Sequence, residues 1–375
     1  MSTDRITGAR RSRLAIISSS ASLLERNCRH IVRAAQTRAN AVLCLAPGLP
    51  IGVAGSGPLE GASMVNLPTE PRDPDGLGKA ARSAAQTAFD DWRPDTVLAC
   101  GLDALAFSHA IARKSRLSHI SLLQYGEPVL PPLGFYDRLT MRHEWHAALK
   151  ACRAVIVADR SIATAMRDDI KLAPSDASVR IVSGAGVDLA AVAAAPLPGI
   201  GDGFRIMAFA EPYDLVAPQI WQAIAAHMAE RGHAVSVELV CPAARRLVDP
   251  QAVDETEITR MVATLDVLPE AIARAHVCVA LFGAQTFTDS LQTALALGRP
   301  VLALDTPAHR RAVDERVNGI LLKSAEPEHI IQGIETMLRR PDLFASMARA
   351  SRAKAERMFD ATVLSAAVLD ALELR

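Results

Sequence analysis

Aromatic residues are scarce in this sequence of 375 residues. It holds three Trp, three Tyr and nine Phe, although half of its residues are hydrophobic. The core must therefore be built mainly from Ala, Val, Leu and Ile. Single cores rarely grow beyond about 250–300 residues, so a chain of this length is expected to form two domains.

An excess of charge of either sign is also lacking, since 41 Lys and Arg balance 41 Asp and Glu. Proteins that bind nucleic acid usually present a basic face, so no nucleic-acid partner is predicted. No hydrophobic run approaches the roughly 20 residues of a membrane-spanning helix. The basic and apolar N-terminal stretch, broken by three serines, is interpreted as a first strand and not as a signal peptide. We expect a cytoplasmic protein without a membrane span, and peripheral membrane contact stays open.

Closely spaced cysteine pairs are absent, which argues against a zinc site and a C-x-x-C redox motif. The six cysteines are expected to be free, mostly buried thiols in a reducing compartment. They are Cys28, Cys44, Cys100, Cys152, Cys241 and Cys278. His143 and His146 lie three residues apart on a predicted helix, without the H-E-x-x-H spacing or a third ligand, so they are interpreted as surface residues. No metal and no cofactor are predicted.

Short apolar runs alternate with amphipathic segments through the first half of the chain, a pattern typical of parallel sheets covered by helices on both faces. The predicted strands are Leu14–Ser18, Ala41–Leu45, Thr96–Cys100, Ile120–Leu123, Ala154–Val157 and Val179–Val182. The predicted helices are Leu23–Gln36, Asp103–Lys114, Asp137–Ala151 and Ile162–Ile170.

A second series of the same kind follows Pro196–Gly203, a segment rich in Pro and Gly that has the composition of a linker. Its predicted strands are Arg205–Ala208, Val235–Val240, Val277–Leu281, Val301–Leu304 and Gly319–Leu322. Its predicted helices are Pro218–Glu230, Pro269–Ala275, Ser290–Leu297 and Ala308–Glu315, and the chain is helical from Pro327 on. The fold class is thus α/β, with two doubly wound, Rossmann-like domains.

Five segments in order resemble family 4 glycosyltransferases of the GT-B fold. They are VRIVSGAGVDLAA (Val179–Ala191), VLPEAIARAHVCVALF (Val267–Phe282), DSLQTALALGRPVLALD (Asp289–Asp305), the long segment Val317–Met347 and MFDATVLSAAVLDAL (Met358–Leu372). The resemblance implies an acceptor-side domain at 1–195, a nucleotide-sugar domain at 204–355 and a C-terminal helix, 356–375, that returns to the first domain. It is good over residues 150–375 and weak over the first 120.

The resemblance also implies a nucleotide-sugar co-substrate, with a donor site that carries two glutamates spaced E-x7-E. Here these positions hold Ala284 and Gln292. The family's diphosphate-binding Arg and Lys are missing from Phe209–Pro218, which offers Glu211 and Asp214 instead. The chain therefore resembles the family with a degenerate motif.

Candidate donor-binding residues lie at the start of one predicted helix and after the predicted strand Val235–Val240. The helix start is Thr288-Asp289-Ser290, whose N–H groups suit an anion, with Gln292 as a ribose partner. Arg245 and Arg246 are candidate replacement cations. The structural alternative for Gln292 is a capping box with Asp289.

Candidate acceptor-binding residues follow two strands of the first domain. Gln124, Tyr125 and Glu127 come after one strand, and Ser19 lies in the serine loop after another. The alternatives are a turn shaped by Gly126 and Pro128, and a plain polar loop. No catalytic residue is identified.

The resemblance implies a glycosyltransferase, acting with retention on a glycan or lipid-linked acceptor in bacterial surface or exopolysaccharide synthesis. Two alternatives stay open. One is a catalytically degenerate protein of the same fold that binds a ligand or partner, and the other is a nucleotide-sugar epimerase.

Overall fold

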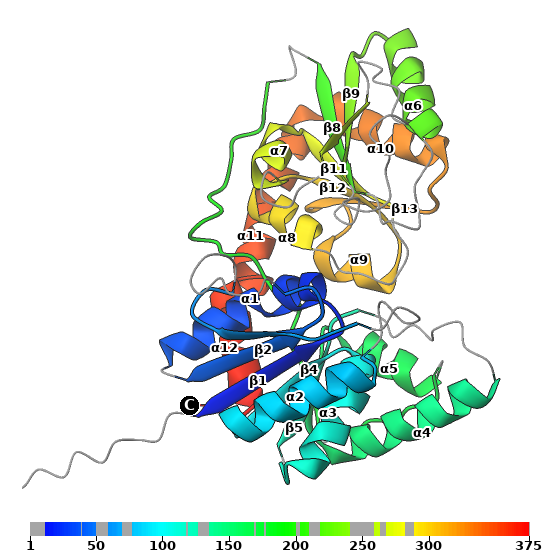
Figure 1. Ribbon diagram of the computed structural model, residues 1–375. Helices are drawn as coiled ribbons and strands as arrows, with labels where there is room; N and C mark the ends of the chain where they lie inside the picture. Colours follow the sequence, from blue (N-terminus) through cyan, green and yellow to red (C-terminus); the bar gives the residue numbers. More distant parts are fainter. Residues whose placement is uncertain are drawn as a thin grey trace, which may run out of the picture. The chain divides into compact units, whose positions relative to one another are not determined.

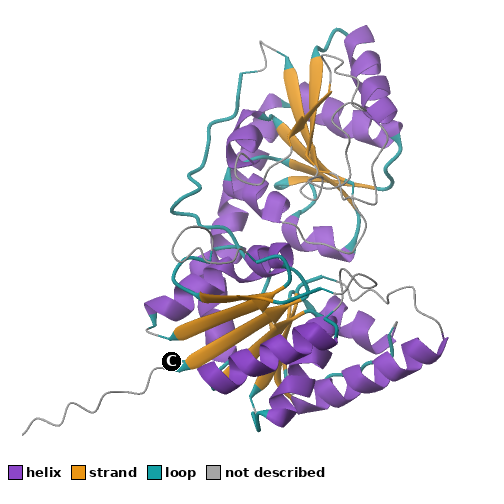
Figure 2. Ribbon diagram, in the orientation of Figure 1, coloured by secondary structure: helices purple, strands orange, loops and turns teal. Residues whose placement is uncertain are grey.

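The computed structural model describes residues 12–374, except residues 39, 50–58, 70–76, 118, 127–134, 169, 176–177, 200–202, 210–217, 241–258, 263–267 and 282–288. The chain divides into two compact units. Unit 1 contains Met1–Ala185 and Thr362–Arg375, and unit 2 contains Gly186–Ala361. Each unit is a parallel sheet with helices on both faces (Figure 1, Figure 2). The predicted α/β class with two doubly wound sheets is confirmed.

The unit 1 sheet has the strand order β3-β2-β1-β4-β5-β6-β7. Its strands are β1 (Arg13–Ser18), β2 (Ala41–Ala46), β3 (Ser63–Asn66), β4 (Thr96–Cys100), β5 (Ile120–Gln124), β6 (Cys152–Val157) and β7 (Val179–Ile181). Its helices are α1 (Ala21–Thr37), α2 (Lys79–Trp92), α3 (Leu102–Lys114), α4 (Phe135–Ala151), α5 (Arg160–Asp168) and α12 (Ala361–Ala371).

Local sequence explains how the central helices of unit 1 begin. The Ser20 side chain accepts a hydrogen bond from the Leu23 N–H at 3.2 Å, which caps α1. Helix α1 then buries Leu24, Cys28 and Ile31 at helical spacing. Helix α3 begins after Gly101, whose φ of 91° is a conformation that favours glycine.

The unit 2 sheet has the strand order β10-β9-β8-β11-β12-β13. Its strands are β8 (Phe204–Phe209), β9 (Val235–Val240), β10 (Thr259–Val262), β11 (Val277–Ala280), β12 (Val301–Leu304) and β13 (Gly319–Leu322). Its helices are α6 (Pro218–Glu230), α7 (Leu268–Arg274), α8 (Asp289–Ala296), α9 (Pro307–Ala312), α10 (Pro327–Arg339) and α11 (Pro341–Met358).

The Gly298-Arg299-Pro300 sequence after α8 does more than end that helix. The Arg299 side chain is fully buried and donates to four backbone carbonyls. They belong to Ile272 (3.2 Å), Ala195 (3.0 Å), Pro196 (2.9 Å) and Ala273 (2.7 Å). Arg299 thus fastens the segment before β8 to the last turn of α7.

The chain enters and leaves unit 2 along two adjacent segments. Val187 and Asp360 form a parallel bridge. The Val187 N–H donates to the Phe359 carbonyl at 2.8 Å, and the Ala361 N–H donates to the Val187 carbonyl at 3.0 Å. Helix α12 then joins unit 1, where Val368 and Leu369 are buried in its core (Figure 1).

Three elements were not predicted from the sequence: β3, α2 and β10. Strand β3 is short and only half-buried, so it lacks a strong apolar run. None of the described helices is long and apolar enough to cross a membrane.

Candidate functional site

The strand order of each sheet reverses at one place, and ligands of doubly wound proteins bind outside the carboxyl ends of the strands there. In unit 1 this place lies between β1 and β4. Ser18 at the end of β1 is in register with Cys100 at the end of β4, and Cys100 is in register with Leu123 of β5. The residues that follow these strands therefore meet at one edge of the sheet.

The side chains of Ser18 and Ser20 hold the serine loop after β1 in place through hydrogen bonds. Ser18 is buried, and its side chain accepts from the Ser20 N–H at 3.4 Å, while Ser20 caps α1. Ser19, the candidate acceptor residue, lies between them and is half-buried. Small hydroxyl-bearing side chains thus lie at this edge of the sheet.

Gln124 ends β5 on the same sheet edge, two strands from β1. Strands in a sheet lie about 4.8 Å apart, so the two candidate segments are separated by about 10 Å. Gln124 Nε2 donates to the Gly126 carbonyl at 2.9 Å. Its Oε1 is buried and has no hydrogen-bond donor in the part of the chain that the structure describes. Such an acceptor suits a ligand hydroxyl or a water. Tyr125 is buried, and Glu127 lies outside the described residues.

Two thiols lie under this edge. Cys28 of α1 and Cys100 of β4 are 3.0 Å apart between their Sγ atoms. The hydrogen bond with Cys100, together with burial, raises the pKa of the Cys28 thiol well above its usual range. Burial raises the pKa of Cys44 to about 12. Thiols in this state are neutral and unreactive at physiological pH, so they pack as small hydrophobic groups.

In unit 2 the reversal lies between β8 and β11. Most predicted donor residues near it, namely Thr288, Arg245, Arg246 and the side chain of Asp289, lie outside the described residues. The backbone of Asp289 starts α8, in whose first turn Ser290 and Gln292 are both buried. Gln292 Oε1 accepts from the Gly186 N–H at 3.0 Å. Gln292 therefore joins α8 to the GVD turn at the start of unit 2, a contact that sequence reasoning missed.

The loop after β12 is held by hydrogen bonds among residues 304–310. Thr306 caps α9 by accepting from the His309 N–H at 3.2 Å, and His309 Nδ1 contacts the Leu304 carbonyl at 2.8 Å. Burial lowers the pKa of His309, so the ring is neutral at physiological pH. Arg310 holds Asp305 through two hydrogen bonds of 2.5 and 2.8 Å, and these bonds lower the pKa of that carboxyl.

Within the described residues, no group of three or more His, Cys, Asp or Glu side chains is arranged to hold a metal ion. After β1 and β5 of unit 1 the polar side chains are hydroxyls and an amide, and after β12 of unit 2 they include His309 and the Asp305–Arg310 pair.

One third of the chain matches a known family model. Residues 216–340 match the family model described as glycosyl transferases group 1. This range covers α6 to α10 and includes Gln292. No curated protein matches the chain.

Solved structures match almost the whole chain. A glycosyltransferase from Rickettsia africae is 11% identical with a TM-score of 0.76, covering 97% of this chain and 98% of that one. A sucrose-phosphate synthase from Thermosynechococcus elongatus is 14% identical with a TM-score of 0.75, covering 96% and 98%. Anabaena HepE in complex with UDP-glucose is 14% identical with a TM-score of 0.69, covering 96% and 99%. The resemblance to GT-B glycosyltransferases is confirmed.

Proposed function

We propose that this chain, with its GT-B fold and its group 1 glycosyl transferase segment, transfers a sugar from a nucleotide-sugar donor to a glycan or lipid-linked acceptor. The observation that carries the proposal is the match of residues 216–340, which include β11, one of the two strands between which the order of the unit 2 sheet reverses. We further propose a retaining reaction in the cytoplasm that serves bacterial surface or exopolysaccharide synthesis.

The donor would bind unit 2 outside the carboxyl ends of β8 and β11. The first turn of α8 offers N–H groups to the diphosphate, and Arg245 and Arg246 would supply positive charge as the nucleotide leaves. Gln292 would face the ribose. Its Oε1 already accepts from Gly186, so a ribose contact would use the amide donor or share that acceptor. The absence of a carboxylate there would weaken donor binding, because charge-assisted hydrogen bonds are roughly twice as strong as neutral ones.

The acceptor would bind unit 1 near Ser19, Gln124, Tyr125 and Glu127. The buried Oε1 of Gln124 supports this placement, since a sugar hydroxyl could donate to it. Holding the acceptor hydroxyl and the donor in a reactive geometry supplies much of the rate enhancement of a bimolecular transfer.

The first experiment measures donor binding. Thermal unfolding and calorimetric titration would be performed with UDP, GDP, ADP and their glucose conjugates, with UDP-glucose first because HepE was solved with it. A donor at 100 times its Kd should stabilise the protein by about 2.7 kcal/mol. If none of these nucleotides stabilises the protein at millimolar concentration, the transferase proposal fails.

Variants locate the site. We expect Arg245→Gln together with Arg246→Gln to weaken donor binding at least about tenfold, because each removes a charge-assisted contact with phosphate. Arg349→Gln is the matched control, since Arg349 is exposed on α11 in the same unit. Equal affinity of the double variant and the control would show that the two arginines do not bind the donor.

The alternative is a catalytically degenerate protein of the same fold that binds a ligand or a partner. The missing second carboxylate and the missing cations after β8 favour it. Binding of a nucleotide-sugar, without nucleotide release in the presence of candidate acceptors, is its expected signature. Product formation that requires Gln124 or Glu127 would eliminate it.

A further inference from the structure

A cavity on unit 1 is lined by none of the residues assigned to sugar transfer. Its volume is about 640 Å³, within the range of small-molecule sites of about 300–1,000 Å³. It lies between α4 and the segment that follows α5. Its lining residues are Leu139, Thr140, Arg142, His143, His146, Lys171 and Leu172.

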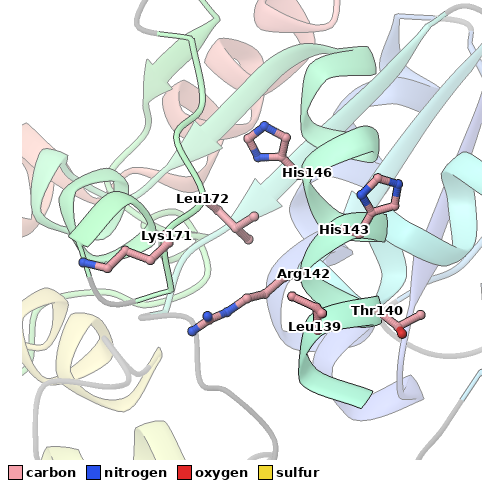
Figure 3. Close-up of a pocket in the computed structure, with 7 residues that line it drawn as sticks. All are labelled: Leu139, Thr140, Arg142, His143, His146, Lys171 and Leu172. Atoms are coloured by element: carbon pink, nitrogen blue, oxygen red, sulfur yellow. The ribbon is translucent and has the colours of Figure 1, made fainter. Parts of the chain in front are cut away.

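The lining is unusual in its charge. Two of its residues are permanent cations, two are histidines, and none is Asp or Glu, although the whole chain has equal numbers of acidic and basic residues. Figure 3 shows Arg142 and His146 pointing from α4 toward the segment that carries Lys171 and Leu172. This arrangement favours an anion.

Arg142 gives a second, independent sign of a ligand. Its Nε is buried and has no hydrogen-bond acceptor in the part of the chain that the structure describes. Buried donors are nearly always paired, so this N–H suits an acceptor supplied by a ligand. Trp145 and Ala148 of the same helix are buried in the core of unit 1, so the helix that carries Arg142 is held in place.

Lys171 lies on the facing segment in a strained backbone conformation. Its φ is 58°, in the left-handed region that a residue with a side chain rarely adopts. Its Nζ donates to the Asp168 carbonyl at 2.6 Å, and an ammonium group has further N–H donors. A strained residue beside a cavity is a reason to look for function there.

The cavity also has an apolar part. Leu172 is buried at one side, and Leu139 is 59% exposed, which makes it one of the few large hydrophobic side chains in the described residues that face water. A bare phosphate would leave Leu139 exposed to water. A ligand with an apolar group attached to the phosphate would cover it, with the buried Leu172 beside it.

We propose that this cavity binds the phosphate group of an amphiphilic ligand. Arg142 and Lys171 hold the phosphate with His146 beside them, and Leu139 and Leu172 contact the apolar part. The guanidinium fork of Arg142 suits the tetrahedral oxygen arrangement of a phosphate. The proposal does not depend on sugar transfer, because it uses neither the donor nor the acceptor residues.

The test compares three probes by calorimetry and sedimentation: inorganic phosphate, monooctyl phosphate, and vesicles of phosphatidic acid against vesicles of phosphatidylcholine. Monooctyl phosphate should bind at least about tenfold more tightly than inorganic phosphate, because its chain covers the exposed Leu139. Binding to phosphatidic acid vesicles alone would identify a lipid as the source of the phosphate. Binding of the soluble ester alone would identify a soluble ligand.

Variants decide whether this cavity is responsible. Arg142→Gln and Lys171→Gln should each lower the affinity about tenfold, and Arg142→Lys should restore part of it. Lys150→Gln is the matched control, since Lys150 is exposed on the same helix and does not line the cavity. Thermal unfolding would verify that each variant is folded. The proposal is overturned if no probe binds, or if Arg142→Gln binds as tightly as Lys150→Gln.

Discussion

The two units share an architecture but stabilise their interiors differently. In the described part of unit 1, most buried polar side chains are small hydroxyls: Ser18, Thr96, Ser108, Ser121 and Ser365. Unit 2 buries larger polar groups: His276, Gln292, Arg299, His309, Asn318 and Lys354. Several of these join distant parts of the chain, as in Gln292 with Gly186 across 106 positions and Arg299 with Ala195 across 104.

This difference has a consequence for mutation. Apolar cores tolerate substitutions that conserve volume. A buried polar group that loses its partner costs the full desolvation of that partner. Unit 2 should therefore be the more sensitive unit to single polar substitutions, and unit 1 the more tolerant.

The largest effect is expected for Arg299→Met. The change leaves four buried carbonyls without the donor they have in the unchanged protein. We therefore expect the free energy of unfolding of unit 2 to fall by about 3 kcal/mol or more. Urea unfolding combined with hydrogen exchange would assign the loss to a unit. Arg13→Met is the control in unit 1, where Arg13 is half-buried and its side chain donates to Trp92 at 2.7 Å; a loss of about 1 kcal/mol is expected. Equal losses would refute the comparison.

A smaller effect is expected for Gln292→Met. The Gly186 N–H would lose its acceptor in a buried site, at a cost of about 1–3 kcal/mol. Gln292→Glu keeps an acceptor, so it separates loss of the contact from loss of the side chain. If Gln292 also binds the ribose, Gln292→Glu should tighten donor binding. A stability of Gln292→Met equal to that of the unchanged protein would show that the Gly186 contact contributes little.

Alkaline pH is expected to lower the stability of unit 1 more than that of unit 2. Burial raises the pKa values of Cys44 and Cys152 in unit 1, and of Cys278 in unit 2, from 9.0 to about 12. Well below pH 9 each thiol is protonated in both the folded and the unfolded protein, so the free energy of unfolding does not change with pH through these groups. Between pH 9 and 12 the unfolded chain loses the proton first, and stability falls by about 1.4 kcal/mol per pH unit for each thiol.

Unit 1 has more such thiols among the described residues, so it should lose more stability. Urea unfolding from pH 7 to 10.5 would measure the slope, with Cys44→Ala and Cys152→Ala as variants that flatten it. A pH-independent midpoint in this window would show that these thiols ionise equally in both states.

The alternation of apolar runs and amphipathic helices predicts both sheets, because parallel strands buried on two faces leave a strong local signal. It does not predict β3 and β10, which lie at the sheet edges, where burial is weaker. The site was harder to predict. Gln292 and Arg299 could be placed at a helix start and a helix stop from local sequence. The Gly186 partner of Gln292 and two of the four partners of Arg299 lie more than 100 positions away, and no local pattern encodes such a distance.

The return of α12 to unit 1 bears on how the protein is made. All of unit 2 is translated between the two segments that compose unit 1. The residues of the first sheet therefore leave the ribosome before α12, the helix that supplies Val368 and Leu369 to the core of unit 1. During that interval its apolar surface is exposed to the cell. We therefore expect the nascent chain to bind a chaperone until α12 has been translated.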